Sequence, residues 1–145
     1  TSLFKTEPWI IWEARFKFTP GDPTELHRLR EEKIAYRKSH HPQGPSAGSI
    51  FQNLYVRDLP SNFFNRFPGL KEKVRGEKIG AGSLLEALQM KGRAVGGAMV
   101  SLEHANIIVN TGQATAVDIQ ALVSLIKQEV VAHFGIELHE EPQFI

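Results

Sequence analysis

The sequence predicts a single α+β domain over residues 1–145, in which a small mixed sheet packs against helices. Three patterns support this fold class. The second half of residues 9–18 alternates apolar and charged side chains, and residues 106–110 form a short apolar run, so both segments are predicted strands. Residues 115–135 repeat apolar side chains at helical spacing. No period of 20–50 residues recurs, which excludes a solenoid.

A first helix is predicted directly after the strand at residues 9–18. Asp22 is a favourable N-cap residue and Pro23 suits the first helical position, so the helix should run from there to about His40. Its polar composition is more typical of a solvated surface helix than of a nucleic-acid-binding one. The apolar residues expected on its buried side are Leu26, Leu29 and Tyr36.

The middle of the chain predicts little regular structure. Residues 42–49 are rich in proline, glycine and serine, which favours a turn leading into the apolar pair Ile50-Phe51. Residues 54–80 are expected to be irregular, with one helical turn near residues 61–66.

Glycines mark the segment that follows. The turn Gly80-Ala81-Gly82 resembles the start of a dinucleotide-binding fingerprint, but Leu85 stands where the third glycine is required, so a simple turn is favoured. Residues 83–90 predict a short helix with inward leucines. The pair Gly96-Gly97 predicts that two backbones approach each other closely.

The last helix has signals at both ends. Thr115 can cap it and Asp118 completes an acidic capping box, while Gly135 suits a left-handed C-cap. Residues 136–138 and 143–145 are predicted to be short closing strands. The apolar face of the helix comprises Ile119, Leu122, Val123, Ile126, Val130 and Phe134.

Composition excludes several classes of protein. The net charge is +1 at pH 7, so no general attraction to nucleic acid or anionic lipid is expected. The chain has no cysteine, which excludes disulfides and thiolate chemistry and allows a cytoplasmic location, the location we predict. No apolar run approaches the ~20 residues of a membrane span. The six histidines lack metal-ligand spacing, so no metal site is predicted.

One loop has a composition suited to ligand binding. In residues 45–51, two serines flank a small turn that could expose a hydroxyl and several backbone N–H groups to an anionic ligand. A purely structural turn explains the same residues, since the hydrolase pattern Gly-x-Ser-x-Gly is missing. Physical reasoning from the residues alone leaves both interpretations open.

A series of segments, taken in order, resembles one enzyme family. The segments are TSLFK at 1–5, PSAGSIFQN at 45–53, AGSLL at 81–85, LQMKG at 88–92, GGAMVS at 96–101, HANIIVN at 104–110, ATAVD at 114–118, FGIEL at 134–138 and the terminal Glu141. Together they resemble the C-terminal, substrate-binding domain of the UDP-N-acetylenolpyruvoylglucosamine reductases, also called UDP-N-acetylmuramate dehydrogenases. The resemblance covers nearly the whole chain.

This resemblance implies an oxidoreductase of peptidoglycan precursor synthesis. Members of the family reduce the enolpyruvyl double bond of UDP-N-acetylglucosamine enolpyruvate to the lactyl ether of UDP-N-acetylmuramate. NADPH reduces a bound FAD, and the flavin delivers a hydride to C3 of the substrate. The expected partners are therefore this small-molecule substrate and the FAD-binding domain, with neither nucleic acid nor membrane.

The resemblance also implies roles for five residues. Ser49 matches the serine that supplies a proton at C2, and Glu141 matches the second catalytic group, an acid or hydrogen-bond donor at the substrate carboxylate. Asn53 and Lys78 match positions that contact the substrate diphosphate. His104 falls where some members have a polar residue of the substrate pocket.

The resemblance also points to a missing part. The FAD-binding domain is expected before Thr1, so we predict that residues 1–145 are the substrate-binding half and that this half alone is inactive. His40 and Gln143 depart from the lysine and arginine usual in the family. The alternative function is a non-catalytic UDP-sugar-binding module.

Overall fold

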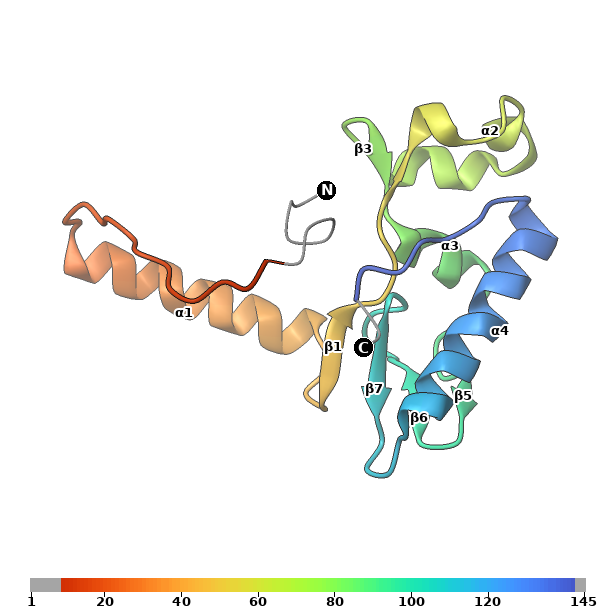
Figure 1. The fold of residues 1–145 in the computed structure, drawn as a ribbon. Helices are drawn as coiled ribbons and strands as arrows, with labels where there is room; N and C mark the ends of the chain where they lie inside the picture. The colour runs from red at the N-terminus through yellow and green to blue at the C-terminus, as the bar shows by residue number, and fades with distance from the viewer. Residues whose placement is uncertain (1–8, 143–145) are drawn as a thin grey trace. The chain divides into compact units, whose positions relative to one another are not determined.

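The computed structural model describes residues 9–142, which fall in two compact units, Thr1–Ala35 and Tyr36–Ile145 (Figure 1). Helix α1, Pro23–His40, crosses the boundary between them. The helices and sheets of the C-terminal unit form a single α+β domain, which confirms the predicted fold class.

The predicted strand at residues 9–18 is wrong. This segment has no regular structure, and its large apolar side chains are exposed. A strand is stable when its backbone N–H and C=O groups pair with a neighbouring strand, and residues 9–35 contain no second strand. The exposed residues are Trp9, Ile10, Ile11, Trp12, Phe16 and Phe18.

Helix α1 begins at the predicted N-cap. The Glu25 N–H donates to Asp22 Oδ1 at 2.8 Å, which satisfies one of the free donors of the first turn. The expectation of a buried side is wrong, because no residue of the helix is buried. Intrahelical ion pairs on its surface, such as Arg28 with Glu25 at 2.7 Å, suit a solvated helix.

A four-stranded antiparallel sheet forms one part of the C-terminal unit. Its strand order is β1 (Ser46–Ser49), β7 (Ile107–Asn110), β6 (Ala98–Val100), β5 (Ala94–Val95). Strand β7 confirms the prediction for residues 106–110. The prediction of a turn without regular structure at 42–49 is wrong at its end, since β1 pairs with β7 through an irregular register at Gly48, where φ is +81°.

A second, three-stranded antiparallel sheet lies in the region predicted to be irregular. Its order is β2 (Leu54–Tyr55), β4 (Lys78–Ile79), β3 (Val74–Arg75). The strands are only two residues long, too short for an alternation pattern to be visible in the sequence. All pairings within both sheets are antiparallel, so the expected single mixed sheet is replaced by two.

Three short helices join β2 to β3 within this second sheet, and a fourth leads from β4 to β5 of the first sheet. The predicted helical turn near residues 61–66 is present as α2, and the helix predicted over 83–90 is present as α3, which starts two residues earlier. The elements are η2 (Val56–Asp58), α2 (Phe63–Arg66), η3 (Pro68–Lys73) and α3 (Ala81–Ala87).

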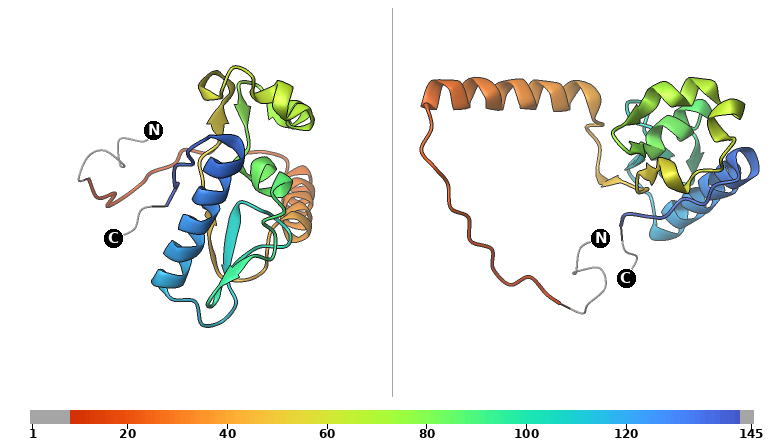
Figure 2. Two further views of the ribbon diagram at one scale, coloured as in Figure 1. Left: turned by 90° about the vertical axis from the view of Figure 1, so that its right-hand side faces the viewer. Right: turned by 90° about the horizontal axis from the view of Figure 1, so that it is seen from above.

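Helix α4, Ala116–Phe134, packs against β5 and β6 and closes the core (Figures 1 and 2). Both of its predicted caps are confirmed: Thr115 and Asp118 form the capping box, and Gly135 is left-handed with φ +69°. Five of the six residues of the predicted face are buried and Ile119 is partly buried. The strand predicted at 136–138 is absent, and residues 143–145 lie outside the described residues.

The predicted close approach at Gly96-Gly97 is confirmed. A Cβ added to Gly97 would lie 2.4 Å from the backbone nitrogen of Ala114, a distance that real Cβ atoms do not reach. The turn between β5 and β6 can therefore lie against the loop before α4 only because position 97 has no side chain.

Candidate functional site

The site predicted from the sequence centres on the segment that follows β1. Residues 50–52 lie between two other segments of the chain, with residue 106 on one side and residues 139–141 on the other. The Ile50 N–H donates to the backbone oxygen of Asn106 at 2.9 Å. Ser49, exposed at the end of β1, leads directly into this three-segment junction.

Glu141 is brought to the same junction from the far end of the sequence. Its backbone N–H donates to the Ile50 oxygen at 2.7 Å, and Phe51 and Glu140 form an isolated antiparallel bridge beside it. Glu141 is therefore paired with Ile50, the residue that directly follows Ser49. Backbone hydrogen bonds thus bring the segment of Glu141 to the end of β1, where Ser49 lies.

Glu140, next to Glu141, has a different role. Lys127 Nζ on α4 lies 3.1 Å from its Oε1 and 3.3 Å from its Oε2. Burial acts to raise the pKa of this carboxyl, but its backbone hydrogen bond and Lys127 together lower the pKa below the ordinary 4.5. This ion pair ties the C-terminal segment to α4 and thereby helps to hold Glu141 beside Ile50.

Asn53 and Lys78 lie further along the same surface. Asn53 Oδ1 accepts a hydrogen bond from the Ala81 N–H at 3.3 Å, at the start of α3. Lys78 is the cross-strand partner of Tyr55, and its Nζ lies 4.3 Å from the centre of the Tyr55 ring. The ring holds the ammonium group by a cation–π contact while the lysine remains exposed.

His104 approaches this surface from the loop before β7. Its Nδ1 accepts the Asn106 N–H at 3.2 Å, which requires the neutral tautomer that carries its proton on Nε2. Its ring lies against Gly82, where a Cβ would be 3.3 Å from His104 Cε1. Through the start of α3, His104 is thus connected to Asn53.

The pKa of the His104 imidazole is lowered below its ordinary 6.5, first by burial and then by the nearby His41. The unfolded chain therefore binds this proton more tightly than the folded chain does. The contribution of neutral His104 to the stability of the fold is complete above pH 6.5 and is lost as the pH falls below it.

We expect an NMR titration of the His104 Cε1 proton to give a midpoint below 6.5. The free energy of unfolding in urea should also decrease as the pH falls from 7 to 5. A His104→Asn variant, whose Oδ1 can replace Nδ1 as acceptor, should show a shallower decrease. A midpoint at or above 6.5 would contradict the buried neutral imidazole.

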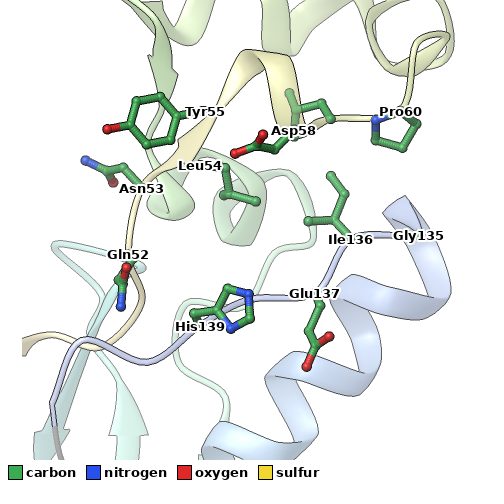
Figure 3. Close-up of a pocket in the computed structure, with 11 residues that line it drawn as sticks. Gln52, Asn53, Leu54, Tyr55, Asp58, Pro60, Gly135, Ile136, Glu137 and His139 are labelled. Atoms are coloured by element: carbon green, nitrogen blue, oxygen red, sulfur yellow. The ribbon is translucent and has the colours of Figure 1, made fainter. Parts of the chain in front are cut away.

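A cavity of about 650 Å³ opens beside this surface (Figure 3). It lies between β2 with the residues around it and the segment that follows α4, and the side chains of Asp58, Glu137 and His139 line it. Of the five predicted site residues, only Asn53 lines this cavity. The two carboxylates make it a poor site for a diphosphate, so the exposed surface from Ser49 to Lys78 is the better candidate.

The Gly80-Ala81-Gly82 turn does not fit a cofactor phosphate. One of its amides, that of Ala81, already donates to Asn53, and Gly82 packs against His104 and Asn106. This turn therefore provides no flavin site, as the missing third glycine indicates. Residues 9–142 contain no group of three side chains that could hold a metal ion and no helix long and apolar enough to cross a membrane.

Comparison with known proteins identifies the family. The model of the C-terminal domain of UDP-N-acetylenolpyruvoylglucosamine reductase matches residues 39–145. The chain belongs to this reductase family. The match begins near the end of α1 and covers all five predicted site residues, together with both sheets.

Relatives of the reductase family match the chain almost from end to end. The reductase of Synechococcus sp. (strain WH7803) is 41% identical over 97% of this chain, and that of Heliobacterium modesticaldum is 38% identical over 99%. The crystal structure of the reductase from Thermus caldophilus has 34% identity and a TM-score of 0.58 over 88% of this chain. The chain spans about two-fifths of the length of these reductases.

Asn106 is a residue of this junction to which the sequence analysis assigns no role. The residue is only 4% exposed, and its side chain bonds to both the N–H and the C=O of Phe51. The available signal was weak: a lone asparagine at the start of an apolar strand, within the HANIIVN segment. Which partner such an amide finds depends on the tertiary structure.

Proposed function

We propose that this chain is the substrate-binding half of a UDP-N-acetylenolpyruvoylglucosamine reductase and supplies the proton donor and the carboxyl group of the reaction. The pairing of Glu141 with Ile50, the residue after Ser49, carries this proposal: Glu141 N–H donates to Ile50 O at 2.7 Å although the two residues lie far apart in the sequence. In the proposed reaction the enolpyruvyl double bond gains a hydride at C3 and a proton at C2.

Ser49 is the proposed proton donor. An alcohol is a weak acid, so its Oγ must be held within hydrogen-bond reach of C2 while negative charge develops there. The substrate carboxylate takes up part of this charge, and Glu141 is the proposed group that donates a hydrogen bond to it or protonates it. The exposed position of Ser49 on β1 leaves its hydroxyl accessible to a substrate.

Asn53 and Lys78 are the proposed contacts of the diphosphate. Lysine provides a flexible positive charge that suits phosphate oxygens, and an asparagine amide donates hydrogen bonds to them. His104, next to Gly82 and Asn106, is proposed as a polar residue at the edge of the same pocket.

FAD, reduced by NADPH and held outside this chain, supplies the hydride in this proposal. The partner of the chain is then the flavin-binding part of the same enzyme, which agrees with a chain two-fifths as long as its relatives. Peptidoglycan precursor synthesis and a cytoplasmic location follow as parts of the same proposal.

A chimera tests the proposal directly. In it, this chain replaces the segment that it matches in the Synechococcus sp. (strain WH7803) reductase. We expect NADPH oxidation that depends on UDP-N-acetylglucosamine enolpyruvate and yields its lactyl ether, detected by mass spectrometry. The 145-residue chain alone, given FAD, NADPH and substrate, should show no oxidation above the control without protein.

Substrate binding to the chain itself separates the two candidate functions. A folded chimera without turnover, combined with binding of the UDP-sugar to the chain, would favour the non-catalytic binding module. Absence of both turnover and binding would overturn both proposals.

Lys78→Ala should weaken the affinity of the chain for UDP-N-acetylglucosamine enolpyruvate by about 10-fold, equivalent to ~1.4 kcal/mol. The reason is the loss of the exposed positive charge that the Tyr55 ring holds. The affinity is measured by titration with NMR detection at low salt, where an exposed charge is least screened.

Lys71→Ala, which removes an exposed lysine from η3, is the matched control and should leave the affinity unchanged. Equal weakening in the two variants would mean that net charge, rather than a site at Lys78, attracts the ligand.

A further inference from the structure

Three segments meet around Phe51, and the hydrogen bonds between them have a defined pattern. Glu141 N–H donates to Ile50 O at 2.7 Å, and Gln52 N–H donates to His139 O at 2.9 Å. These two bonds flank the bridge between Phe51 and Glu140. In such a non-hydrogen-bonded pair of an antiparallel ladder, the N–H and C=O of the central residue point away from the partner strand. Those of Phe51 therefore point away from residues 139–141.

The side chain of Asn106 forms hydrogen bonds with both the N–H and the C=O of Phe51. The Phe51 N–H donates to Asn106 Oδ1 at 3.0 Å, and Asn106 Nδ2 donates to the Phe51 oxygen at 2.8 Å. Its backbone oxygen also accepts from Ile50 N–H at 2.9 Å. The residue is 4% exposed, so water cannot readily replace these bonds.

The amide of Asn106 takes the place of a neighbouring strand at this point. Ser49 still pairs with Ile107 in the ladder between β1 and β7, but beyond it the chain on the β7 side turns away toward His104. A carboxamide has a donor and an acceptor in one plane, as a peptide group does, and can therefore continue the ladder by one residue. Aspartate, which is acceptor-only when ionised, cannot donate to Phe51.

We propose that Asn106 is a positioning residue, which sets the place of Ser49 relative to Glu141 by holding the Phe51 peptide groups from the opposite side. The inference rests on the proposed function of that pair. Residues 50–51 are bonded to Asn106 on one side and to the segment of Glu141 on the other. Without the hydrogen bonds of the Asn106 side chain, the Phe51 peptide groups are held from one side only, by the segment of Glu141, and the end of β1 at Ser49 can shift relative to it.

Loss of the Asn106 side-chain hydrogen bonds should affect the chemical step and not the binding of substrate. Asn53 and Lys78 make separate contacts with Ala81 and Tyr55, whereas the hydrogen bonds of the Asn106 side chain go to Phe51. A displacement of about 1 Å at a reacting group can cost on the order of 100-fold in rate. In the chimera, Asn106→Asp should therefore lower kcat by about 10- to 100-fold, while KM changes less than about threefold.

Asn110→Ala is the matched control. Its Oδ1 accepts from Gly112 N–H at 2.8 Å and Ala114 N–H at 2.9 Å, so it is also a loop-holding asparagine, at the other end of β7. This variant should leave kcat unchanged. An equal fall in kcat in both variants, or an unchanged kcat in Asn106→Asp, would overturn the proposal. If Asn106→Asp does not fold, the smaller and neutral Asn106→Ser takes its place.

Structural readouts on the 145-residue chain keep the inference testable if the chimera has no activity. Hydrogen exchange of the Phe51 amide should accelerate at least 10-fold in Asn106→Asp, and the contacts between the backbones of residues 50 and 141 should weaken in nuclear Overhauser spectra. Unchanged exchange and contacts would overturn the positioning role. An inactive wild-type chimera with these changes present would count against the proposed function alone.

Discussion

Replacing Ser49 by alanine should lower kcat of the chimeric reductase by about 10²- to 10⁴-fold, the usual contribution of a positioned acid or base. The hydroxyl is the proposed source of the C2 proton, and alanine removes it with little change in volume. Water can enter the space and deliver the proton slowly, so a residual rate is expected. The measurement is steady-state NADPH oxidation at saturating substrate.

Ser46→Ala is the matched control for this prediction. Ser46 is an exposed serine of the same strand and pairs with Val109 of β7, but it lies at the opposite end from Glu141. Its replacement should leave kcat within about twofold of the unmodified chimera. A Ser49→Ala chimera that retains most of its rate would show that the proton comes from another group, and the proposed role of Ser49 would be withdrawn.

Truncating Phe134 to alanine should destabilise the domain by about 3–5 kcal/mol, the range for a buried phenylalanine. Phe134 is 1% exposed, and its ring lies 4.8 Å from that of Phe67 and 5.9 Å from that of Phe63, measured between centres. The substitution would leave a cavity where α4, α2 and η3 meet. Phe134 ends α4, Phe63 lies in α2, and Phe67 stands between α2 and η3. Equilibrium unfolding of the 145-residue chain in urea gives the free energy.

The control for Phe134 lies on the same helix. Val131 is 49% exposed, so Val131→Ala removes little buried surface and should cost less than about 1 kcal/mol. Equal destabilisation by the two substitutions would mean that the aromatic contacts of Phe134 contribute little to the stability of the domain.

Helix α4 shows how much of the fold local signals can predict. Its N-cap, its C-cap and its apolar face all lie within about twenty consecutive residues, and each contributes to the same helix. Strand β7 was predicted for a similar reason, since three residues of high strand propensity stand between polar neighbours. Where propensity, pattern and capping agree within one segment, little tertiary information is required.

The segments predicted wrongly depend on partners. Residues 9–18 have the pattern of a strand, but a pattern supplies only one side of each backbone pair, and the described part of their own unit offers no second strand. Conversely, β2 and β4 have only two residues each, and they are strands because Tyr55 and Lys78 happen to be opposed. In both cases the deciding contact lies outside the segment.

The site residues also divide into what the sequence predicts and what only tertiary contacts reveal. Ser49, Glu141, Asn53, Lys78 and His104 came from the ordered motifs of a family resemblance, and the family is confirmed by the match over residues 39–145. Their chemical roles remain predictions. The residues themselves do not reveal that Glu141 bonds to Ile50 or that Asn106 holds Phe51, because those contacts join segments far apart in the chain.

The sequence by itself determined the α+β class, the long helix with its caps, the main strand and the family to which the chain belongs. Only the tertiary structure decided that Glu141 pairs with Ile50, next to Ser49, that two short sheets replace one, and that the apolar pattern of residues 9–18 forms no strand. The physical reason is that caps and amphipathic faces are satisfied by neighbours in sequence, whereas the hydrogen bonds of an extended segment must be completed by another segment.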